Sequence, residues 1–357
     1  MPEEISILNK IKGKAVLAPM LATTDIPFRS VCRAHGAALT FTEMVSAAGI
    51  LRSASNSFRN AVFSPDEHPI GIQLVAAEAD DAAAAVRELL PLKPDLFDLN
   101  CGCPNERICE AGAGAQLLDD LPRLLSILRA AVAASPVPVS VKLRLLDRRG
   151  SQPVRDLMRR VEDSGVALIT LHARTRTTPY DEPANWEAIA EAVESVAVPL
   201  VGNGDIFSAQ DARRMMRETG CAAVMVARGA LGTPWIFRDI AEGFANDSDT
   251  CAPKPAEMSR LVDGHLAAII REYGGVRSLP RLRKHLLWYA RRYPGAGDLR
   301  RRVFANDNPE TVADEARRFF DAFPRVLAVD DPLRLDTERR FRDRVLYWTS
   351  ALTLPEG

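Results

Sequence analysis

The 357-residue sequence is poor in several features that would assign it to a specialised class of protein. Its 6 cysteines are too few for the disulfide framework of a small secreted scaffold in a chain of this length. No run of about 18 apolar residues could span a membrane, and the first residues lack the apolar stretch of a signal peptide. These absences predict a cytoplasmic protein with reduced thiols and no membrane association.

The chain also lacks an excess of either charge, since 46 Lys and Arg residues face 47 Asp and Glu residues and leave a net charge of -1. This balance excludes a uniformly basic nucleic-acid binder, although it leaves room for a local basic patch. Hydrophobic residues make up 47% and charged residues 26%, which excludes collagen-like, coiled-coil and disordered chains. We expect either two domains or one large α/β domain with a small addition.

Eight short apolar segments with strand character recur at intervals too long for hairpins. They are residues 15–18, 38–41, 70–74, 96–99, 137–141, 167–171, 198–201 and 222–226. Helical patterns separate most of them, at 78–90, 115–134, 154–164, 186–195 and 208–219. Because strands that alternate with helices form parallel sheets, this order predicts an α/β fold, a closed (β/α)8 TIM barrel. A doubly wound sheet is the alternative, but the glycine-rich turn typical of its first strand is absent.

The composition changes after Phe237, where the strand patterns stop. Polar residues at 246–250, followed by two prolines, indicate a linker. Beyond the linker, the spacing of Leu, Ala and Phe is helical. We therefore predict a barrel over 1–245, a small all-helical domain over 256–335 and a C-terminal tail over 336–357.

Polar or conformationally special residues stand at the carboxyl end of every predicted strand, where TIM-barrel active sites form. Glycine-containing turns follow the last two strands, at 202–205 and 227–229, and the second turn carries Arg228. Backbone N–H groups in such turns bind phosphate, and an Arg strengthens the binding. One such turn is typical of an ordinary connection, but two on neighbouring strands favour a phosphate-bearing ligand.

Three further residues at these strand ends have chemistry that a structural role does not require. Lys142 lies within a strand, and an ammonium that points into a barrel is costly unless it meets an anion or a hydrogen-bonding ligand. His172 ends a strand near the predicted phosphate turns, although a satisfied structural histidine is its default interpretation. Cys103, in segment 100–104, is a candidate nucleophile or proton donor. Structural zinc takes four ligands from paired cysteines, and the sequence has no second pair, so we expect no metal.

The ordered set of strand-end motifs resembles the tRNA-dihydrouridine synthases, flavoenzymes that reduce particular uridines in tRNA. The resemblance extends from about Val16 to Phe237, and residues 282–289 are similar to the helical-domain motif of that family. The motifs that carry it are Ala18-Pro19-Met20, Thr42-Glu43-Met44-Val45, Gly71-Ile72-Gln73-Leu74, Asp98-Leu99-Asn100-Cys101-Gly102-Cys103-Pro104, Ala113-Gly114-Ala115, Val141-Lys142-Leu143-Arg144, Leu171-His172-Ala173-Arg174-Thr175, Gly202-Asn203-Gly204-Asp205-Ile206 and Ala227-Arg228-Gly229-Ala230.

The resemblance implies FMN as the cofactor, NADPH as its reductant and tRNA as the substrate. It implies that hydride passes from the reduced flavin to C6 of uracil and that Cys103 donates a proton to C5. It places the FMN phosphate in the two turns, on Asn203, Gly204, Asp205, Ala227, Arg228 and Gly229. The ring and ribityl groups would lie against Pro19, Met20, Gln73, Lys142 and His172. The residues expected to contact RNA are Asn100, Arg107, Arg174, Arg283 and Lys284.

A basic segment supports an RNA partner. Residues 276–302 hold nine basic residues and one acidic residue, Asp298, with aromatic residues between them. Such a run is often a solvated helix face, but beside an RNA-modifying barrel it favours phosphate contact. Neutralising Arg283 and Lys284 is expected to weaken tRNA binding and reduce its salt dependence.

The sequence departs from the family pattern in two respects. Many relatives have Lys where this chain has Arg107, which keeps the charge but changes the geometry. Segment 100–104 is similar to one subgroup and segment 283–285 to another, so the modified uridine stays open. We expect a monomer. Two alternatives remain, an FMN barrel that reduces a small molecule and a non-catalytic RNA-binding protein on a retained barrel.

Overall fold

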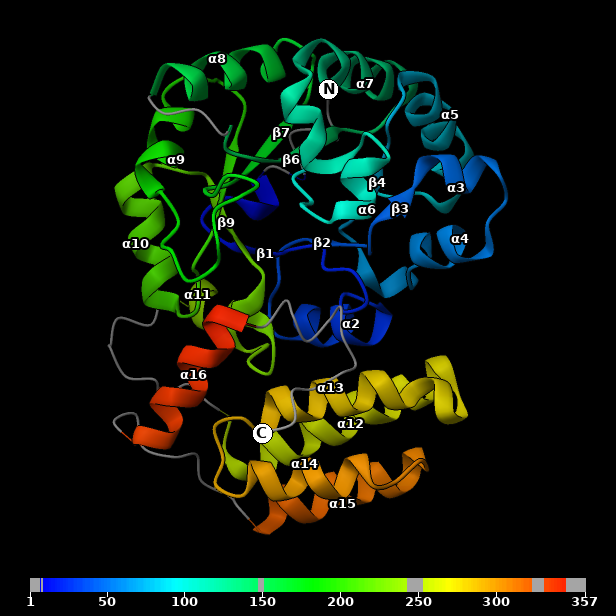
Figure 1. The fold of residues 1–357 in the computed structure, drawn as a ribbon, viewed down its shortest axis with the longest axis vertical. Coiled ribbons are helices and arrows are strands. Elements are labelled where there is room, and N and C mark those ends of the chain that lie inside the picture. Colours follow the sequence, from blue (N-terminus) through cyan, green and yellow to red (C-terminus); the bar gives the residue numbers. More distant parts are fainter. Residues whose placement is uncertain (1–6, 8, 147–150, 243–252, 323–330, 345–357) are drawn as a thin grey trace.

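The computed structural model describes residues 7, 9–146, 151–242, 253–322 and 331–344 of the chain. Parallel strands form a barrel, and a group of helices lies against one side of it (Figure 1). The strands are β1 (Ala15–Leu17), β2 (Thr40–Phe41), β3 (Val45–Ser46), β4 (Ile70–Val75), β5 (Leu96–Cys101), β6 (Val139–Arg144), β7 (Leu168–His172), β8 (Leu200–Asn203) and β9 (Ala223–Val226).

The strands follow one another around the barrel in the order β1-β9-β8-β7-β6-β5-β4-β2, and all pairs are parallel. The ring closes between β1 and β2, where Leu17 N donates to Leu39 O at 2.9 Å and Ala38 N donates to Ala15 O at 2.9 Å. The prediction of eight strands in a closed barrel is therefore confirmed. The sequence pattern missed β3, a two-residue strand that pairs with β4 outside this ring.

Helices cover the outside of the barrel (Figure 1). They are α2 (Ile26–Ala34), α3 (Ala47–Leu51), α4 (Ser55–Ala61), α5 (Ala79–Leu89), α7 (Leu121–Ala134), α8 (Ser151–Glu162), α9 (Trp186–Val193), α10 (Ala209–Thr219) and α11 (Ile236–Ala241). The short helix α6 (Glu106–Glu110), which has no buried residue, follows the carboxyl end of β5. The pattern over 115–134 predicted one helix, but the structure has a 3-10 helix, η3 (Gly114–Asp119), and then α7. The break occurs at Asp120, whose side chain caps α7 by accepting from Arg123 N.

The barrel interior changes from apolar to polar along the strands. Toward the amino ends, Val16, Leu96, Leu168 and Val201 form an apolar cluster with Ile7 and Ile11. Alternate residues on the same strands, including Phe97, Val141 and Ile169, pack outward against the helices. Side chains two and four residues further along each strand also point inward, because alternate residues share a face. At the carboxyl ends of the strands these inward residues are polar.

The C-terminal part of the described chain is helical. It contains α12 (Pro255–Tyr273), α13 (Leu279–Ala290), α14 (Ala296–Phe304), α15 (Pro309–Ala322) and α16 (Pro332–Arg344). Helices α12 to α15 share a separate apolar core that includes Leu266, Leu286 and Phe319. The helical C-terminal region is thus confirmed, whereas the predicted domain boundaries stay a prediction. The predicted linker at 246–250 and the tail beyond 344 lie outside the described residues. Across the described ranges, no helix is both long and apolar enough to cross a bilayer.

Candidate active site

A chain of hydrogen bonds crosses β6, β5 and β4 and runs toward the carboxyl end of β5. Asp98 accepts from Ser140 Oγ at 2.6 Å and from Gln73 Nε2 at 2.7 Å. Asn100 Nδ2 then donates to Gln73 Oε1 at 2.9 Å. Burial raises the pKa of Asp98 to about 6, although the two donors oppose the shift. The network fixes the rotamers of Gln73 and Asn100, two residues predicted to lie in the site.

The network ends at the loop that carries Cys103. Asn100 Oδ1 accepts from Cys103 N at 2.9 Å and from Gly102 N at 3.2 Å, so the strand end holds the loop backbone. On the other side, Cys103 O accepts from Ala115 N at 2.9 Å. A Cβ on Gly114 would lie 2.8 Å from Cys103 O, and its φ of +62° also favours glycine. Glycine at 114 therefore lets η3 approach the cysteine loop.

The Cys103 side chain is half-buried, and burial raises the pKa of its thiol above the ordinary value. Lys142 and Arg144 oppose this shift, but they do not reverse it. The thiol is therefore protonated at neutral pH, the state required of a proton donor and unsuited to a thiolate nucleophile.

Lys142 projects from β6 into the barrel interior. Its Nζ donates to Asn203 Oδ1 at 3.1 Å, and Asn203 Nδ2 donates to Met225 O at 2.8 Å. Burial and the nearby Arg144 lower the pKa of Lys142 to about 8, while Asp98 opposes the shift. Because a partly buried ammonium with a neutral acceptor is incompletely compensated, this position suits an anionic or strongly polar ligand.

His172 is buried at the end of β7 in the same interior layer. Burial, together with Arg144 and other nearby cations, lowers its pKa well below the ordinary value. The imidazole is therefore neutral at physiological pH and offers one donor and one acceptor. The structure brings His172 within ring-stacking distance of Tyr180, at 6.1 Å between centroids. Tyr180 gave no signal in the sequence because it comes from the loop after β7.

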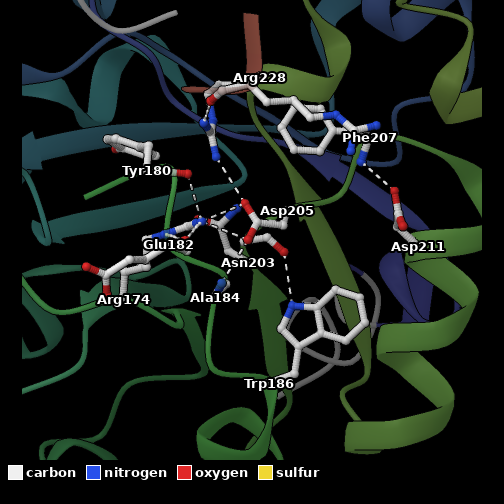
Figure 2. Close-up of polar contacts among 12 residues, drawn as sticks. Arg174, Tyr180, Glu182, Ala184, Trp186, Asn203, Asp205, Phe207, Asp211 and Arg228 are labelled. Atoms are coloured by element: carbon white, nitrogen blue, oxygen red, sulfur yellow. Dashed lines mark hydrogen bonds and ion pairs between the residues drawn. The ribbon is translucent and has the colours of Figure 1, made fainter. Parts of the chain in front are cut away.

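The turns after β8 and β9 form a second, cationic part of the site (Figure 2). Asp205 accepts from Arg174 Nη2 at 2.7 Å and from Arg228 Nη2 at 3.1 Å. The Arg228 guanidinium lies 4.4 Å from the Tyr180 ring centroid. Two buried guanidiniums thus share one carboxylate, and Arg174 Nη1 has no hydrogen-bond partner among the described residues. This donor set fits a phosphate group.

Close packing against neighbouring segments explains the glycines of the two turns. A Cβ on Gly229 would lie 2.1 Å from Ile206 O, which places the β9 turn directly on the β8 turn. Gly204 has a φ of +132°, where side chains are disfavoured, and a Cβ there would lie 2.7 Å from Ala184 Cβ. Ala227 immediately precedes the 3-10 helix η4 (Arg228–Ala230).

Pro19 and Met20 follow β1 and are half-buried at the same end of the barrel. Met20 N donates to Thr24 Oγ1 at 2.9 Å, which holds the loop after β1. Ala22 has a φ of +58°, and its carbonyl accepts from Lys284 of α13. The loop that carries two predicted flavin contacts is therefore held from the helical region.

The predicted RNA contacts have different surroundings. Arg107 is exposed on α6, close to Cys103 in sequence, whereas Arg174 is 2% exposed within the Asp205 ion pair. Arg283 donates to Val303 O at 3.1 Å and pairs with Asp307 at 2.9 Å. Lys284 also donates to Thr23 Oγ1, at 3.3 Å. With the hydrogen bonds of Asn100 described above, the structure thus gives four of these five side chains partners within the chain.

Internal partners also reduce the positive charge of the basic segment at 276–302. Seven of its nine basic residues have hydrogen-bond or ion-pair partners within the described residues: Arg281, Arg283, Lys284, Arg291, Arg292, Arg301 and Arg302. Carboxylates from elsewhere in the chain, such as Asp25, Glu315 and Glu338, supply several of these partners. Local charge in the sequence therefore overstates the charge that this face presents.

A parallel barrel with polar and cationic side chains gathered at the carboxyl ends of its strands defines an α/β-barrel enzyme. Residues 16–324 match the sequence family described as dihydrouridine synthase. The chain therefore belongs to the dihydrouridine synthase family, and it is an oxidoreductase.

Individual relatives agree with this assignment. The chain is 32% identical over 321 residues to tRNA-dihydrouridine synthase B of Pseudomonas putida, covering 90% of this chain and 95% of the relative. It is 34% identical over 326 residues to the enzyme of the same name from Xanthomonas campestris, covering 90% and 97%. A probable tRNA-dihydrouridine synthase 1 of Synechocystis is 35% identical over 306 residues, covering 85% of each chain.

Solved structures support the fold alone. A histamine dehydrogenase from Rhizobium is similar with a TM-score of 0.50 and 13% sequence identity. The match covers 87% of this chain but 62% of that larger protein.

Proposed function

We propose that the protein reduces the C5–C6 double bond of a uridine in tRNA, with FMN reduced by NADPH and with Cys103 as the proton donor. The names of the relatives given above include tRNA, and this supports tRNA as the substrate. The observation that carries the proposal is the position of Cys103 at the end of a polar strand layer, where Asn100 Oδ1 accepts from the Cys103 backbone N–H and burial raises the pKa of the thiol.

The residues at the strand ends fit FMN by their chemistry. Arg228, with the backbone of Asn203, Gly204, Ala227 and Gly229, would hold the phosphate, and Asp205 would orient Arg228. Pro19, Met20, Gln73, Lys142 and His172 would surround the ring and ribityl groups. The chemistry that bound FMN supplies at this site is hydride transfer to C6 of uracil.

The protein's own residues then complete the reaction. The Cys103 thiol donates a proton to C5, and Asn100 holds the cysteine backbone while that proton leaves. A uridine must leave its stack to reach the strand ends, so we expect base flipping. For RNA contact we propose Arg107 at the exposed rim and Asn100 beside Cys103. Arg174, Arg283 and Lys284 have internal partners, so we assign them to holding Asp205, the segment after α14 and the loop after β1.

Two measurements test the proposed function. Purified protein should show a flavin absorption band that NADPH bleaches, and a colourless protein that binds no FMN would favour the non-catalytic RNA-binding alternative. Mass spectrometry of tRNA from a deletion strain should show the loss of dihydrouridine at a defined position. Unchanged tRNA from that strain, together with a flavin-loaded protein, would favour the small-molecule reductase.

Lys142 gives the site a pH-dependent affinity for FMN. Its pKa is lowered to about 8, so the ammonium is present below pH 8 and is lost as the pH rises through that value. FMN affinity of the wild type should therefore fall above pH 8. Lys142→Met should bind FMN roughly 10- to 100-fold more weakly at pH 7, the effect of one charge-assisted hydrogen bond. The Lys142→Met variant should also lack the decline in FMN affinity above pH 8. Titration by flavin fluorescence quenching measures both effects.

The control is Lys14→Met, which removes the same charge from an exposed position just before β1. It should leave FMN affinity unchanged. Equal losses in the two variants would mean that overall charge, and not Lys142, controls binding.

A further inference from the structure

Helix α16 lies outside the family match, which ends at residue 324, yet it contacts the candidate phosphate turns. It packs beside the barrel and the α12–α15 helices (Figure 1). Phe341, 8% exposed, belongs to the barrel's main apolar cluster, and Arg342 follows it. Helix α16, which lies beyond the matched residues, thus contacts a site whose turns lie within them.

One contact joins α16 directly to Arg228. An Arg228 guanidinium nitrogen donates to the main-chain carbonyl of Arg342, while its other terminal nitrogen pairs with Asp205. The Phe207 ring centroid lies 5.2 Å from the Arg228 guanidinium and 4.8 Å from that of Arg342. Arg228 is therefore fixed between the β8 turn and α16, and Arg342 brings a further cation close to the turns.

A partly buried ion pair anchors α16 to the residues that directly follow α13. Glu338 accepts from Arg292 and lies 3.5 Å from Arg291 Nε. Burial alone would raise the pKa of Glu338, but Arg291 and Arg292 outweigh burial and lower it to about 2. The carboxylate is thus charged at all physiological pH values.

The anchor is connected to the β9 turn as well. Arg291 Nη1 donates to Leu231 O at 2.6 Å, one residue after η4, and its guanidinium lies 4.1 Å from the Phe341 ring centroid. A Cβ on Gly232 would lie 2.2 Å from Trp288 O, so this turn also packs closely on α13. Helix α16, α13 and the phosphate turn therefore form one contiguous set of contacts.

We infer that α16 is an accessory clamp on the phosphate end of the cofactor site, held by Glu338, which keeps Arg228 in position and slows FMN release. This inference rests on the proposed function, since it takes FMN as the ligand. The clamp acts through the phosphate partner Arg228, so riboflavin, which has no phosphate, should be insensitive to it.

The test compares FMN and riboflavin release from three full-length variants, followed by flavin fluorescence after rapid dilution. Glu338→Gln should release FMN about tenfold faster than the wild type, as expected for the loss of one charge-assisted contact, and riboflavin at the wild-type rate. Arg292→Gln removes one partner of Glu338 but leaves Arg291 beside the carboxylate. It should therefore also speed FMN release. This variant tests the clamp if Glu338→Gln does not fold.

The matched control is Asp336→Asn, which removes a carboxylate from the same helix that pairs with Arg339 and Arg340. It should leave both release rates unchanged. FMN release within twofold of the wild type in the anchor variants, or equal acceleration of FMN and riboflavin, would overturn the clamp. A wild type that binds neither flavin would instead overturn the proposed function.

Discussion

Cys103→Ala should lower dihydrouridine formation by about 10²- to 10⁴-fold, the usual contribution of a positioned general acid, while FMN stays bound. The expectation follows from the raised pKa of the thiol, which keeps the proton available at neutral pH. The NADPH-dependent bleaching of the flavin should be unchanged, because that half of the reaction does not use the thiol. Mass spectrometry of tRNA after a fixed reaction time measures the product, and stopped-flow absorbance measures flavin reduction.

Cys109→Ala is the matched control. Cys109 is also half-buried, and its Sγ lies 3.6 Å from Cys103 O, so the change removes a neighbouring thiol without removing the proton donor. It should retain nearly all dihydrouridine formation. Product formation by Cys103→Ala within threefold of the wild type would exclude the cysteine as the proton donor. Slowed flavin reduction would instead assign the loss to a disturbed flavin site.

The barrel could be predicted from the sequence because its signals are local. Each strand is a short apolar run, and each polar strand end follows from period-2 alternation. In the structure Lys142 donates to Asn203 and Gln73 donates to Asp98, whereas the roles of these residues toward a cofactor stay predictions. The break before α7 also had a local signal that was missed, since Asp120 is a favoured N-cap residue and Pro122 favours the first turn of a helix.

The contacts of the basic residues could not be predicted, because they join distant parts of the chain. Arg228 and Arg342 are 114 residues apart, and Lys284 lies 262 residues from Ala22. A charge count within a segment ignores such partners, which is why residues 276–302 gave a basic patch whose members are mostly paired inside the protein. For the same reason the sequence divides α16 (Pro332–Arg344) between the predicted helical domain, which ends at 335, and the predicted tail, since its contacts with Arg228 and Arg291 leave no local signal.

The second large effect is on stability, and it arises beneath the loop after β1. Arg29 and Glu67 form a two-pronged ion pair, with Nε–Oε1 at 2.6 Å and Nη2–Oε2 at 3.1 Å, and both side chains are 2% exposed. Removing one partner of such a pair leaves a buried charge uncompensated. Glu67→Ala should therefore lower the free energy of unfolding by about 3–5 kcal/mol, measured by urea denaturation.

The exposed pair of Arg123 and Glu78, at 2.7 Å with side chains 35% and 67% exposed, provides the comparison. Glu78→Ala should cost about 1 kcal/mol or less, because solvent screens exposed ion pairs. Equal losses in the two variants would show that burial does not determine the value of the Arg29 pair. A double change, Arg29→Met with Glu67→Leu, removes both charges and should recover most of the stability lost in Glu67→Ala.

The same pair connects stability to the proposed cofactor site. Arg29 Nη1 donates to Thr24 O at 2.7 Å, and the Thr24 hydroxyl in turn accepts from Met20 N. Because the Arg29 guanidinium is positioned by Glu67, Glu67→Ala should weaken FMN binding as well as lower stability, even under conditions where the variant is fully folded. The double variant should recover stability without recovering FMN affinity, since it also lacks the donor to Thr24. Recovery of both stability and FMN affinity would mean that the hydrogen bond from Arg29 to Thr24 O does not position the loop after β1.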